Sequence, residues 1–377
     1  MSSRLREVRT ARGWSQERLV REIERYAHQC MAVVASTASL HVYISEWENG
    51  KRTISARYAA ILRPVLGVTS SELLGNPASS ALPASADGYE DLVSRIESAR
   101  SIGVDVVNSL MDQTELLRTF DRQRGAASLV DQMAGHLATL EEALTFAVLP
   151  DARQPVARAL AGAATLAAWQ ALDVGAVERA WRHYELAKRA AQEADEPMYL
   201  AHAMAEQAYV LCDAGRPTMG LELVRDAIRV GGGRTSPRLG AWLHAAEAEL
   251  CAINGASEDC QRALEKAVAL LPAGGEVRDP DMLSIFLNSG HLERWQGHSL
   301  ALIGNEDAVN SLYAALHSAD PTFVRAKSGL HIDLAQAHLA REEFGQANEH
   351  VQQARLLAGR TGSVRHRRRI DILTARM

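Results

Sequence analysis

The chain has few features of a membrane protein or of a disulfide-stabilised protein. Its 377 residues include only four cysteines, and none of these forms a Cys-x-x-Cys pair. Four cysteines in a chain of this length do not make a disulfide framework. No apolar run approaches the ~20 residues that a membrane-spanning helix needs. We therefore expect a soluble, cytoplasmic protein with reduced cysteines and no membrane association.

Motifs of catalysis, metal binding and cofactor binding are also missing. The thirteen histidines include no His-Glu-x-x-His, and the pairs His291/His298 and His331/His338 have no third ligand nearby in the sequence. The glycine run 231–233 follows no strand pattern and precedes no Gly-Lys-Ser/Thr, as a phosphate-binding loop would. We predict that the protein is not an enzyme and that it binds neither a metal nor a cofactor.

Charge is distributed unevenly along the chain. The net charge is −5, but residues 1–75 hold eleven Lys and Arg against seven Asp and Glu, which leaves them at +4. The remaining residues hold 30 basic and 39 acidic side chains. A basic N-terminal segment on an acidic remainder suits a protein that places one end on phosphates.

The N-terminal segment has the pattern of short amphipathic helices. Gly13 is a plausible left-handed stop for a first helix, and Ser15 can cap a second one. A later helix is predicted from about Ser39 to Trp47, with Ile44 and Trp47 facing the core. Either Leu40 or Val42 can join them, and the helix ends on a basic turn.

Two short motifs carry a resemblance to a known family. Gly13-Trp14-Ser15-Gln16-Glu17 and Trp47-Glu48-Asn49-Gly50 resemble the XRE (Cro/C1-type) helix-turn-helix proteins. The resemblance implies that the helix ending at Trp47 is a DNA-recognition helix. Its exposed positions would then face the major groove, namely His41, Tyr43, Ser45 and Glu46. Phosphate contacts would come from Gln16, Asn49, Lys51 and Arg52, with a solvated side chain as the alternative for Gln16.

The segment departs from the family pattern in three places. Ser15 and Trp47 are thirty-two residues apart, so an insert around residues 25–37 either lengthens the second helix or adds a loop. Glu46 stands where a basic residue is common, so it either accepts from a cytosine amino group or forms a salt bridge within the protein. Pro64 predicts that a helix over residues 55–66 is kinked or split. Residues 67–75 match the family's last short helix.

The rest of the chain is predicted to be all-α. Residues 76–87 lack apolar periodicity and form a linker between a DNA-binding domain, 1–75, and the helical remainder. Residues 88–160 form two or three connecting and capping helices, and 161–377 form repeats with a final capping helix from Val364 to Met377. The arginines of that last helix, Arg365, Arg367, Arg368 and Arg369, make either a solvated face or a second DNA contact.

Small residues recur at regular intervals in this helical part. Pairs seven residues apart begin at positions separated by 40, 40, 48 and 39 residues: Ala180/Ala187, Gly220/Ala227, Cys260/Ala267, Ala308/Ala315 and Ala347/Ala354. Twelve residues before each pair stands Ala168, Ala208, Ala248 or Ala335, with Gln296 as the exception in the fourth unit. The pattern resembles the tetratricopeptide (TPR) repeat, an α-solenoid of stacked helical hairpins.

The TPR resemblance implies a concave groove lined by the first helix of each hairpin. Its groove positions correspond here to Trp169, Asp173, His202, Tyr209, Asp213, Trp242, Glu249 and Gln336, with Asn288 and Glu293 if the fourth unit is in register. Aromatic rings beside carboxylates and amides suit an extended peptide. The alternative is that the rings pack between repeats.

The two resemblances together imply a regulator. A helix-turn-helix joined to TPR repeats resembles the peptide-sensing RRNPP regulators and a set of actinobacterial regulators, whose repeats are similar to residues 116–121 and 167–173. We expect a homodimer that binds double-stranded DNA at a palindromic operator. A peptide or protein segment in the groove would modulate that binding. The alternative is a TPR interaction scaffold with a weak or vestigial DNA-binding head.

Overall fold

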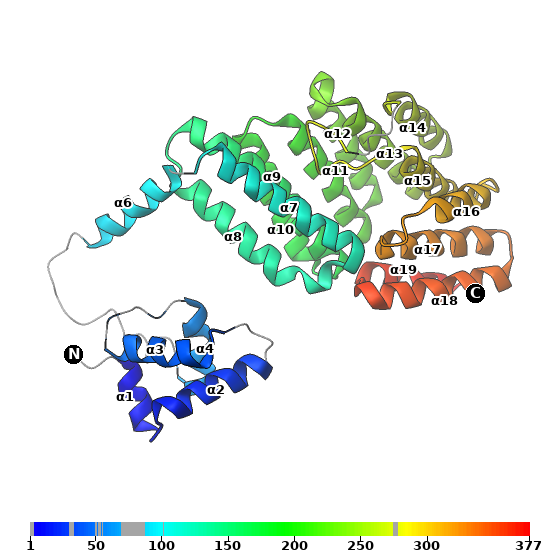
Figure 1. Ribbon diagram of the computed structural model, residues 1–377. Helices are drawn as coiled ribbons and strands as arrows, with labels where there is room; N and C mark the ends of the chain where they lie inside the picture. Colours follow the sequence, from blue (N-terminus) through cyan, green and yellow to red (C-terminus); the bar gives the residue numbers. More distant parts are fainter. Residues whose placement is uncertain are drawn as a thin grey trace. The chain divides into compact units, whose positions relative to one another are not determined.

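The chain is all-α and divides into two compact units, residues 1–86 and 87–377. A computed structural model describes residues 4–29, 34–49, 51, 54, 56–68, 87–100, 102–273 and 278–377 (Figure 1). Within these ranges the chain forms helices and their connections, and one isolated β-bridge joins Arg278 to Phe286. None of the helices in the described ranges is long and apolar enough to cross a membrane.

The N-terminal unit is a small helical domain. It consists of α1 (Arg4–Ala11), α2 (Gln16–Gln29), α3 (Thr37–Glu48) and α4 (Ala56–Leu66). Each helix turns apolar residues spaced by three or four positions toward one core; this core contains Leu5, Leu19, Val20, Ile23, Leu40, Ile44, Trp47, Ile61, Leu62 and Leu66. Gly13, with φ at +67°, ends α1 in the left-handed conformation that its position predicts.

Three details of this unit refine the sequence predictions. Helix α3 begins at Thr37, where the Ser36 hydroxyl accepts a hydrogen bond from the amide of Ser39. Leu40 is the residue that joins the core, while Val42 is 52% exposed. Helix α4 is not split, because Pro64 lies in its final turns and α4 continues to Leu66.

The insert around residues 25–37 falls partly within α2, which continues to Gln29. Residues 30–33, Gly50, Arg52, most of the predicted last short helix, 69–75, and the linker residues 76–86 lie outside the described residues. The predicted phosphate contact by Arg52 is among them.

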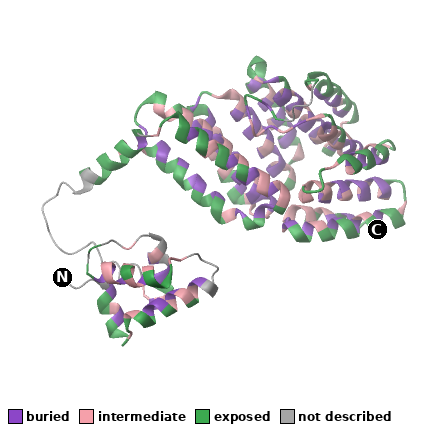
Figure 2. Cartoon of the chain, in the orientation of Figure 1, coloured by how far each residue is buried: buried purple, intermediate pink, exposed green. Residues whose placement is uncertain are grey.

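The second unit begins with three helices that precede the repeats. These are α6 (Asp87–Arg100), α7 (Val104–Arg124) and α8 (Val130–Phe146), with a short 3-10 turn, η1 (Ala126–Ser128), between the last two. Helix α6 is mostly exposed (Figure 2). The predicted boundary at residue 160 falls inside the next helix, because α9 begins at Pro150. The first residue of a helix donates no backbone hydrogen bond within the helix, so the missing amide hydrogen of Pro150 costs nothing at the start of α9.

Five helical hairpins follow and stack on one another, each as a first and a second helix in contact. They are α9 (Pro150–Asp173) with α10 (Val177–Glu193), α11 (Pro197–Asp213) with α12 (Pro217–Gly231), α13 (Pro237–Ile253) with α14 (Ser257–Leu270), α15 (Ser289–Leu302) with α16 (Ala308–Ser318), and α17 (Val324–Ala340) with α18 (Phe344–Thr361). These are TPR-like repeats, and their spacing follows the small residues.

Burial explains why those positions are small. All ten residues of the seven-spaced pairs are buried on the second helices, and Ala168, Ala208, Ala248 and Ala335 are buried on the first helices. In the fourth hairpin the small residue is Gly297 rather than a residue at position 296. A Cβ at Gly297 would lie 2.9 Å from the Leu312 side chain of α16. The register of this hairpin is therefore shifted by one residue from the sequence prediction.

The last helix returns to the first hairpin. Helix α19 (Val364–Thr374) contacts α17, α18 and α9, and α17 contacts α7. Figure 1 shows the C-terminal helices α17 to α19 beside the end of α7. At Gly125, whose φ is +84°, a Cβ would overlap the carbonyl oxygen of Thr361. The stack of hairpins therefore closes on itself, with α9 against α19 and η1 against the end of α18.

Candidate ligand cavity and DNA-binding surface

Helix α3 presents only part of its predicted DNA-contacting set to the outside. His41, Ser45 and Glu46 are half-buried, and Asn49 and Lys51 are exposed. The Tyr43 ring lies 5.9 Å from Trp47 and 6.0 Å from Tyr58, measured between ring centroids, so it packs between α3 and α4. Val42 of α3 is exposed, although the sequence did not predict it as a DNA contact.

A buried ion pair joins the first three helices. The Arg9 guanidinium donates from Nε to Glu48 Oε1 at 2.5 Å and from Nη2 to Oε2 at 3.0 Å. Gln16 donates its amide to the same carboxylate at 2.7 Å. Gln16 thus connects the start of α2 with the end of α3. The carboxylate of this ion pair belongs to Glu48, which is 3% exposed.

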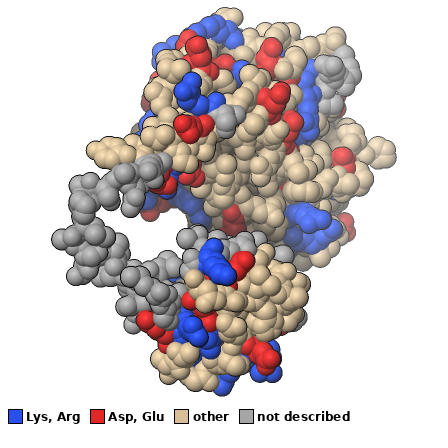
Figure 3. Space-filling view, turned by 60° about the vertical axis from the view of Figure 1, so that its left-hand side comes forward, with Lys and Arg blue, Asp and Glu red and all other residues tan. Residues whose placement is uncertain are grey.

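Basic and acidic side chains are interspersed on the face of the N-terminal unit seen in Figure 3. The net positive charge of this unit is therefore not gathered into one continuous patch on that face.

The second unit contains a cavity of about 320 Å³ within the stack of hairpins, which we call the central cavity. Its walls are the first helices of all five hairpins, α9, α11, α13, α15 and α17, together with α7, the loop before α15, and α19. Helices α7 and α19 line the cavity opposite the hairpins, so the surface that the sequence predicted as a groove is a partly open cavity with walls on both sides.

Six of the ten predicted groove residues line this cavity: Trp169, Asp173, His202, Tyr209, Trp242 and Glu249. Asp213 lies behind the wall and pairs with the cavity residue Arg365. The other three do not line it. Asn288 caps α15 and accepts a hydrogen bond from the amide of His291, Glu293 is exposed, and Gln336 donates to the carbonyl of Ala301 at 3.4 Å.

The one-residue shift of the fourth hairpin also moves its cavity residues. In three of the other four first helices a cavity residue stands six positions before the buried small residue, in three one stands two positions before it, and in three one stands directly after it. Counting from Gly297 gives His291, Trp295 and His298, all of which line the cavity. Counting from position 296 misses them. A search for the small residue beside position 296 would have found this register.

Helix α19 contributes two arginines to the cavity. Arg365 forms a two-point ion pair with Asp213, at 2.9 and 3.3 Å, and Arg369 donates to Asp333 at 2.7 Å. The Ser363 hydroxyl donates to Asp173 at 2.6 Å. Only Arg367 and Arg368 are exposed, so the predicted solvated basic face of the last helix holds just two of the four arginines.

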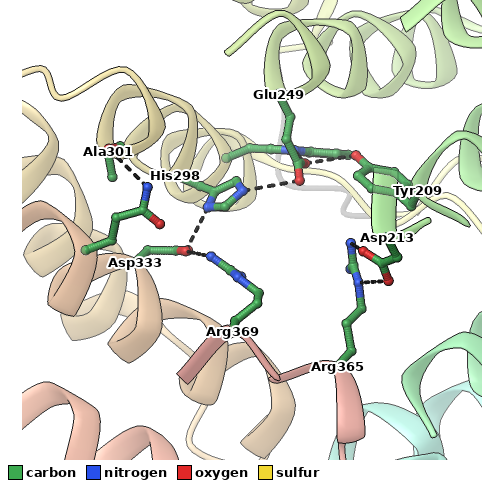
Figure 4. Close-up of polar contacts among 10 residues, drawn as sticks. Tyr209, Asp213, Glu249, His298, Ala301, Asp333, Arg365 and Arg369 are labelled. Atoms are coloured by element: carbon green, nitrogen blue, oxygen red, sulfur yellow. Dashed lines mark hydrogen bonds and ion pairs between the residues drawn. The ribbon is translucent and has the colours of Figure 1, made fainter. Parts of the chain in front are cut away.

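His298 is the centre of a buried polar network (Figure 4). Its Nδ1 donates to Asp333 at 2.7 Å and its Nε2 donates to Glu249 at 3.2 Å. Burial alone would lower the pKa of His298, but the two carboxylates raise it to about 9. Burial alone would raise the pKa of Glu249, but His298 and a hydrogen bond from Trp295 lower it to about 2. Three charged groups are thus held ionised inside the cavity wall.

A second network lies where α7 and α9 meet α17. Arg325 contacts Asp121 at 2.5 Å and Asp173 at 3.7 Å, and its guanidinium lies 6.0 Å from the centre of the Trp169 ring. The pKa of Asp121 is raised by burial, which the charge of Arg325 only partly offsets. Arg365 lies 5.5 Å from the ring centres of both Trp169 and Tyr209. Arginine guanidinium groups therefore lie against the rings of Trp169 and Tyr209.

Histidines gather at one further place, on α17 and α18. His331 Nδ1 lies 2.9 Å from His350 Nδ1, and the rings of His338 and His350 stack at 5.5 Å. His350 is the third histidine that the sequence spacing did not reveal. Even so, within the ranges that the structure describes, no group of three His, Cys, Asp or Glu side chains is arranged to hold a metal ion.

Comparisons with known proteins bear on the helical repeats. The chain is similar in structure to the kinesin light chain-like TPR-like repeats of Podosopora anserina, with 16% sequence identity and a TM-score of 0.34. A single-substitution variant of the same protein gives a TM-score of 0.35, also at 16% identity. In both, the similarity covers 52% of this chain and 94% of the other. No protein-family model and no curated protein matches the chain.

Proposed function

We propose that this chain is a sequence-specific DNA-binding transcriptional regulator whose second unit binds a ligand in the central cavity. The observation that carries the proposal is that cavity, which the first helices of all five hairpins and α19 line, in a chain whose other unit has a compact α2–α3 pair. The proposed protein is cytoplasmic, has no catalytic role and needs no cofactor.

In this proposal α3 is the recognition helix. His41, Ser45 and Glu46 approach base edges, and the exposed Val42 offers an apolar contact of the kind that reads a thymine methyl group. Asn49, Lys51 and Arg52 contact phosphates. Gln16 and Tyr43 act indirectly: Gln16 holds α3 through Glu48, and Tyr43 packs α3 against α4.

The ligand changes operator affinity through the second unit. A differential affinity for two arrangements of that unit, typically about 1 to 3 kcal/mol, is enough for regulation. Contacts of Arg365, Arg369 and Ser363 hold α19 in the cavity wall, so an extended peptide or protein segment that enters the cavity lies against α19. A compact ligand or the end of a short peptide fits the cavity beside it.

A homodimer is part of the proposal, because one recognition helix reads only half of a two-fold operator. Helix α6 supports this. Its Tyr89 is 76% exposed, and Leu92 and Val93 are 44% and 50% exposed. Exposed apolar side chains gathered on one helix are typical of a protein interface.

Fluorescence anisotropy with DNA from upstream of the protein's own gene tests the regulator function. We expect that fragment to compete better than random DNA, with an affinity that falls as salt rises. Replacing Lys51 by alanine should lower the slope of log K against log salt by about one and weaken all sequences alike. Lys266→Ala, on the exposed side of α14, is the matched control and should change nothing. If no fragment competes better than random DNA, the regulator function is wrong.

The second candidate is an interaction scaffold whose head has little DNA affinity. It is favoured by one observation, the engagement of Gln16 and Tyr43 inside the N-terminal unit. For a scaffold, the Lys51 variant leaves partner binding unchanged, and any DNA affinity has no sequence preference.

A further inference from the structure

One corner of the central cavity carries positive charge without a matching carboxylate. Six arginines line the cavity, and four of them have an acidic partner: Arg118 with Glu115, Arg325 with Asp121, Arg365 with Asp213, and Arg369 with Asp333. The other two are Arg122 on α7 and Arg294 on α15. Neither forms an ion pair with any residue in the described part of the chain.

The two arginines are half-buried in the cavity wall. Burial, and then the charge of Arg118, lower the pKa of Arg122 to about 10. Burial also lowers the pKa of Arg294, although Asp333 and Glu249 offset part of this effect. Taking a guanidinium out of water is unfavourable unless an anion accompanies it. The protein therefore holds two cations where a bound anion would relieve an electrostatic cost.

Further polar groups at this corner have no partner among the described residues. Burial and the charges of Arg294 and Arg122 lower the pKa of His291 to about 4, so its ring is neutral at pH 7. Its Nδ1 is buried without a hydrogen bond to the described part of the chain, as is the hydroxyl of Ser284. Both residues line the cavity, and the His291 ring lies within the electrostatic reach of both arginines. Together they supply a hydroxyl and a ring nitrogen to a ligand.

Aromatic rings lie next to these polar groups. The Arg122 guanidinium is 4.5 Å from the centre of the Phe286 ring, which packs edge to face on His291 at 4.8 Å and on Phe323 at 6.2 Å. The cavity volume of about 320 Å³ lies at the lower end of the range of small-molecule sites, about 300 to 1,000 Å³. This is the size of a site for a compact molecule.

We propose that the central cavity binds a compact aromatic or apolar oxyanion, whose carboxylate or phosphate group contacts Arg122 and Arg294 while its body packs against Phe286 and Phe323. Guanidinium groups match both oxyanions in two-point geometry. The regulatory meaning of this site rests on the proposed function, but the binding itself does not require DNA.

Isothermal titration calorimetry on the full-length protein tests the site with three probes of nearly the same shape. These are 3-phenylpropanoate, 2-phenylethyl phosphate and the uncharged 3-phenylpropanamide. We expect one or both anions to bind at least tenfold more tightly than the amide, and the tighter anion identifies the preferred group. Arg294→Met keeps most of the side-chain volume and should reduce anion affinity to that of the amide. Arg367→Met, on the exposed side of α19, is the matched control.

The thermal unfolding of the ligand-free Arg294→Met protein separates loss of binding from loss of folding. We expect its midpoint to equal or exceed that of the unmodified chain, because the substitution removes an unpaired buried charge. The inference is overturned if the amide binds as tightly as the anions, if Arg294→Met keeps the preference, or if none of the three probes binds. Anion binding without sequence-preferring DNA binding would keep this inference and overturn the regulator function, and the opposite result would do the reverse.

Discussion

Replacing His298 by glutamine should remove the contribution of this side chain to the pH dependence of the second unit's stability between pH 7 and 10. In the folded chain His298 lies between Glu249 and Asp333, and its pKa is raised to about 9 from an ordinary value of 6.5. A group whose folded pKa is raised contributes stability that is complete below the unfolded pKa and is lost as pH rises through the folded one. The loss should therefore run from about pH 6.5 to about pH 9 and be almost complete at pH 10.

The magnitude follows from these two pKa values. At pH 7 the folded histidine is almost fully protonated and the unfolded one mostly is not, which corresponds to about 2.5 kcal/mol. At pH 10 both histidines are mostly unprotonated, and the contribution to the free energy of unfolding is close to zero. The His298→Gln variant should thus be less stable than the unmodified chain by an amount that shrinks by about 2.5 kcal/mol between the two pH values.

Urea unfolding followed by tryptophan fluorescence measures this difference, because Trp295 donates to Glu249 in the same network. Other groups that titrate near pH 9 cancel when the variant is compared with the unmodified chain at each pH. His317→Gln, at an exposed position on α16, is the control and should show no pH-dependent difference. An equal effect of His298→Gln at both pH values would refute the assignment of a buried cation at this position.

Three further predictions concern other parts of the chain. Glu48→Gln leaves the buried Arg9 guanidinium without its carboxylate and should destabilise the N-terminal unit by about 3 kcal/mol, measured by thermal unfolding; an unchanged midpoint would contradict the ion pair. Gly125→Ala should destabilise the closure and raise hydrogen exchange in α19, because a Cβ meets the Thr361 carbonyl. Gly135→Ala, on the open side of α8, should instead be neutral or stabilising. Leu92→Glu on α6 should shift the mass from light scattering toward a monomer without changing helicity, and a persistent dimer would place the interface elsewhere.

Much of the fold could be predicted from local patterns. The positions of Ala168, Ala208 and Ala248 indicated the phase of the hairpins, since only small residues fit where two helices approach closely. In the first three hairpins the same phase also identified most of the cavity residues. It failed in the fourth because the small residue, Gly297, is one position later, and a one-residue slip turns a helix by about 100°.

In the N-terminal unit, too, local patterns predicted some features and not others. The core positions Ile44 and Trp47 followed from helical periodicity, and Gly13 from its place before a capped helix. Periodicity could not choose between Leu40 and Val42, because both are apolar and only the packing of α1, α2 and α4 decides which one is covered. Nor could it show that Glu48 forms a buried ion pair, since the partner Arg9 is thirty-nine residues away.

The sequence by itself determined that the chain is all-α, that a short basic helical domain precedes a long repeat region, and which face of most first helices is inward. These properties depend on residues within a turn or two of one another, so their spacing is visible in one dimension. The closure of the repeats was decided only by the tertiary structure. Ser363 meets Asp173 across 190 residues and Arg365 meets Asp213 across 152. The accumulated twist of five hairpins brings these pairs together, and no local pattern encodes that sum.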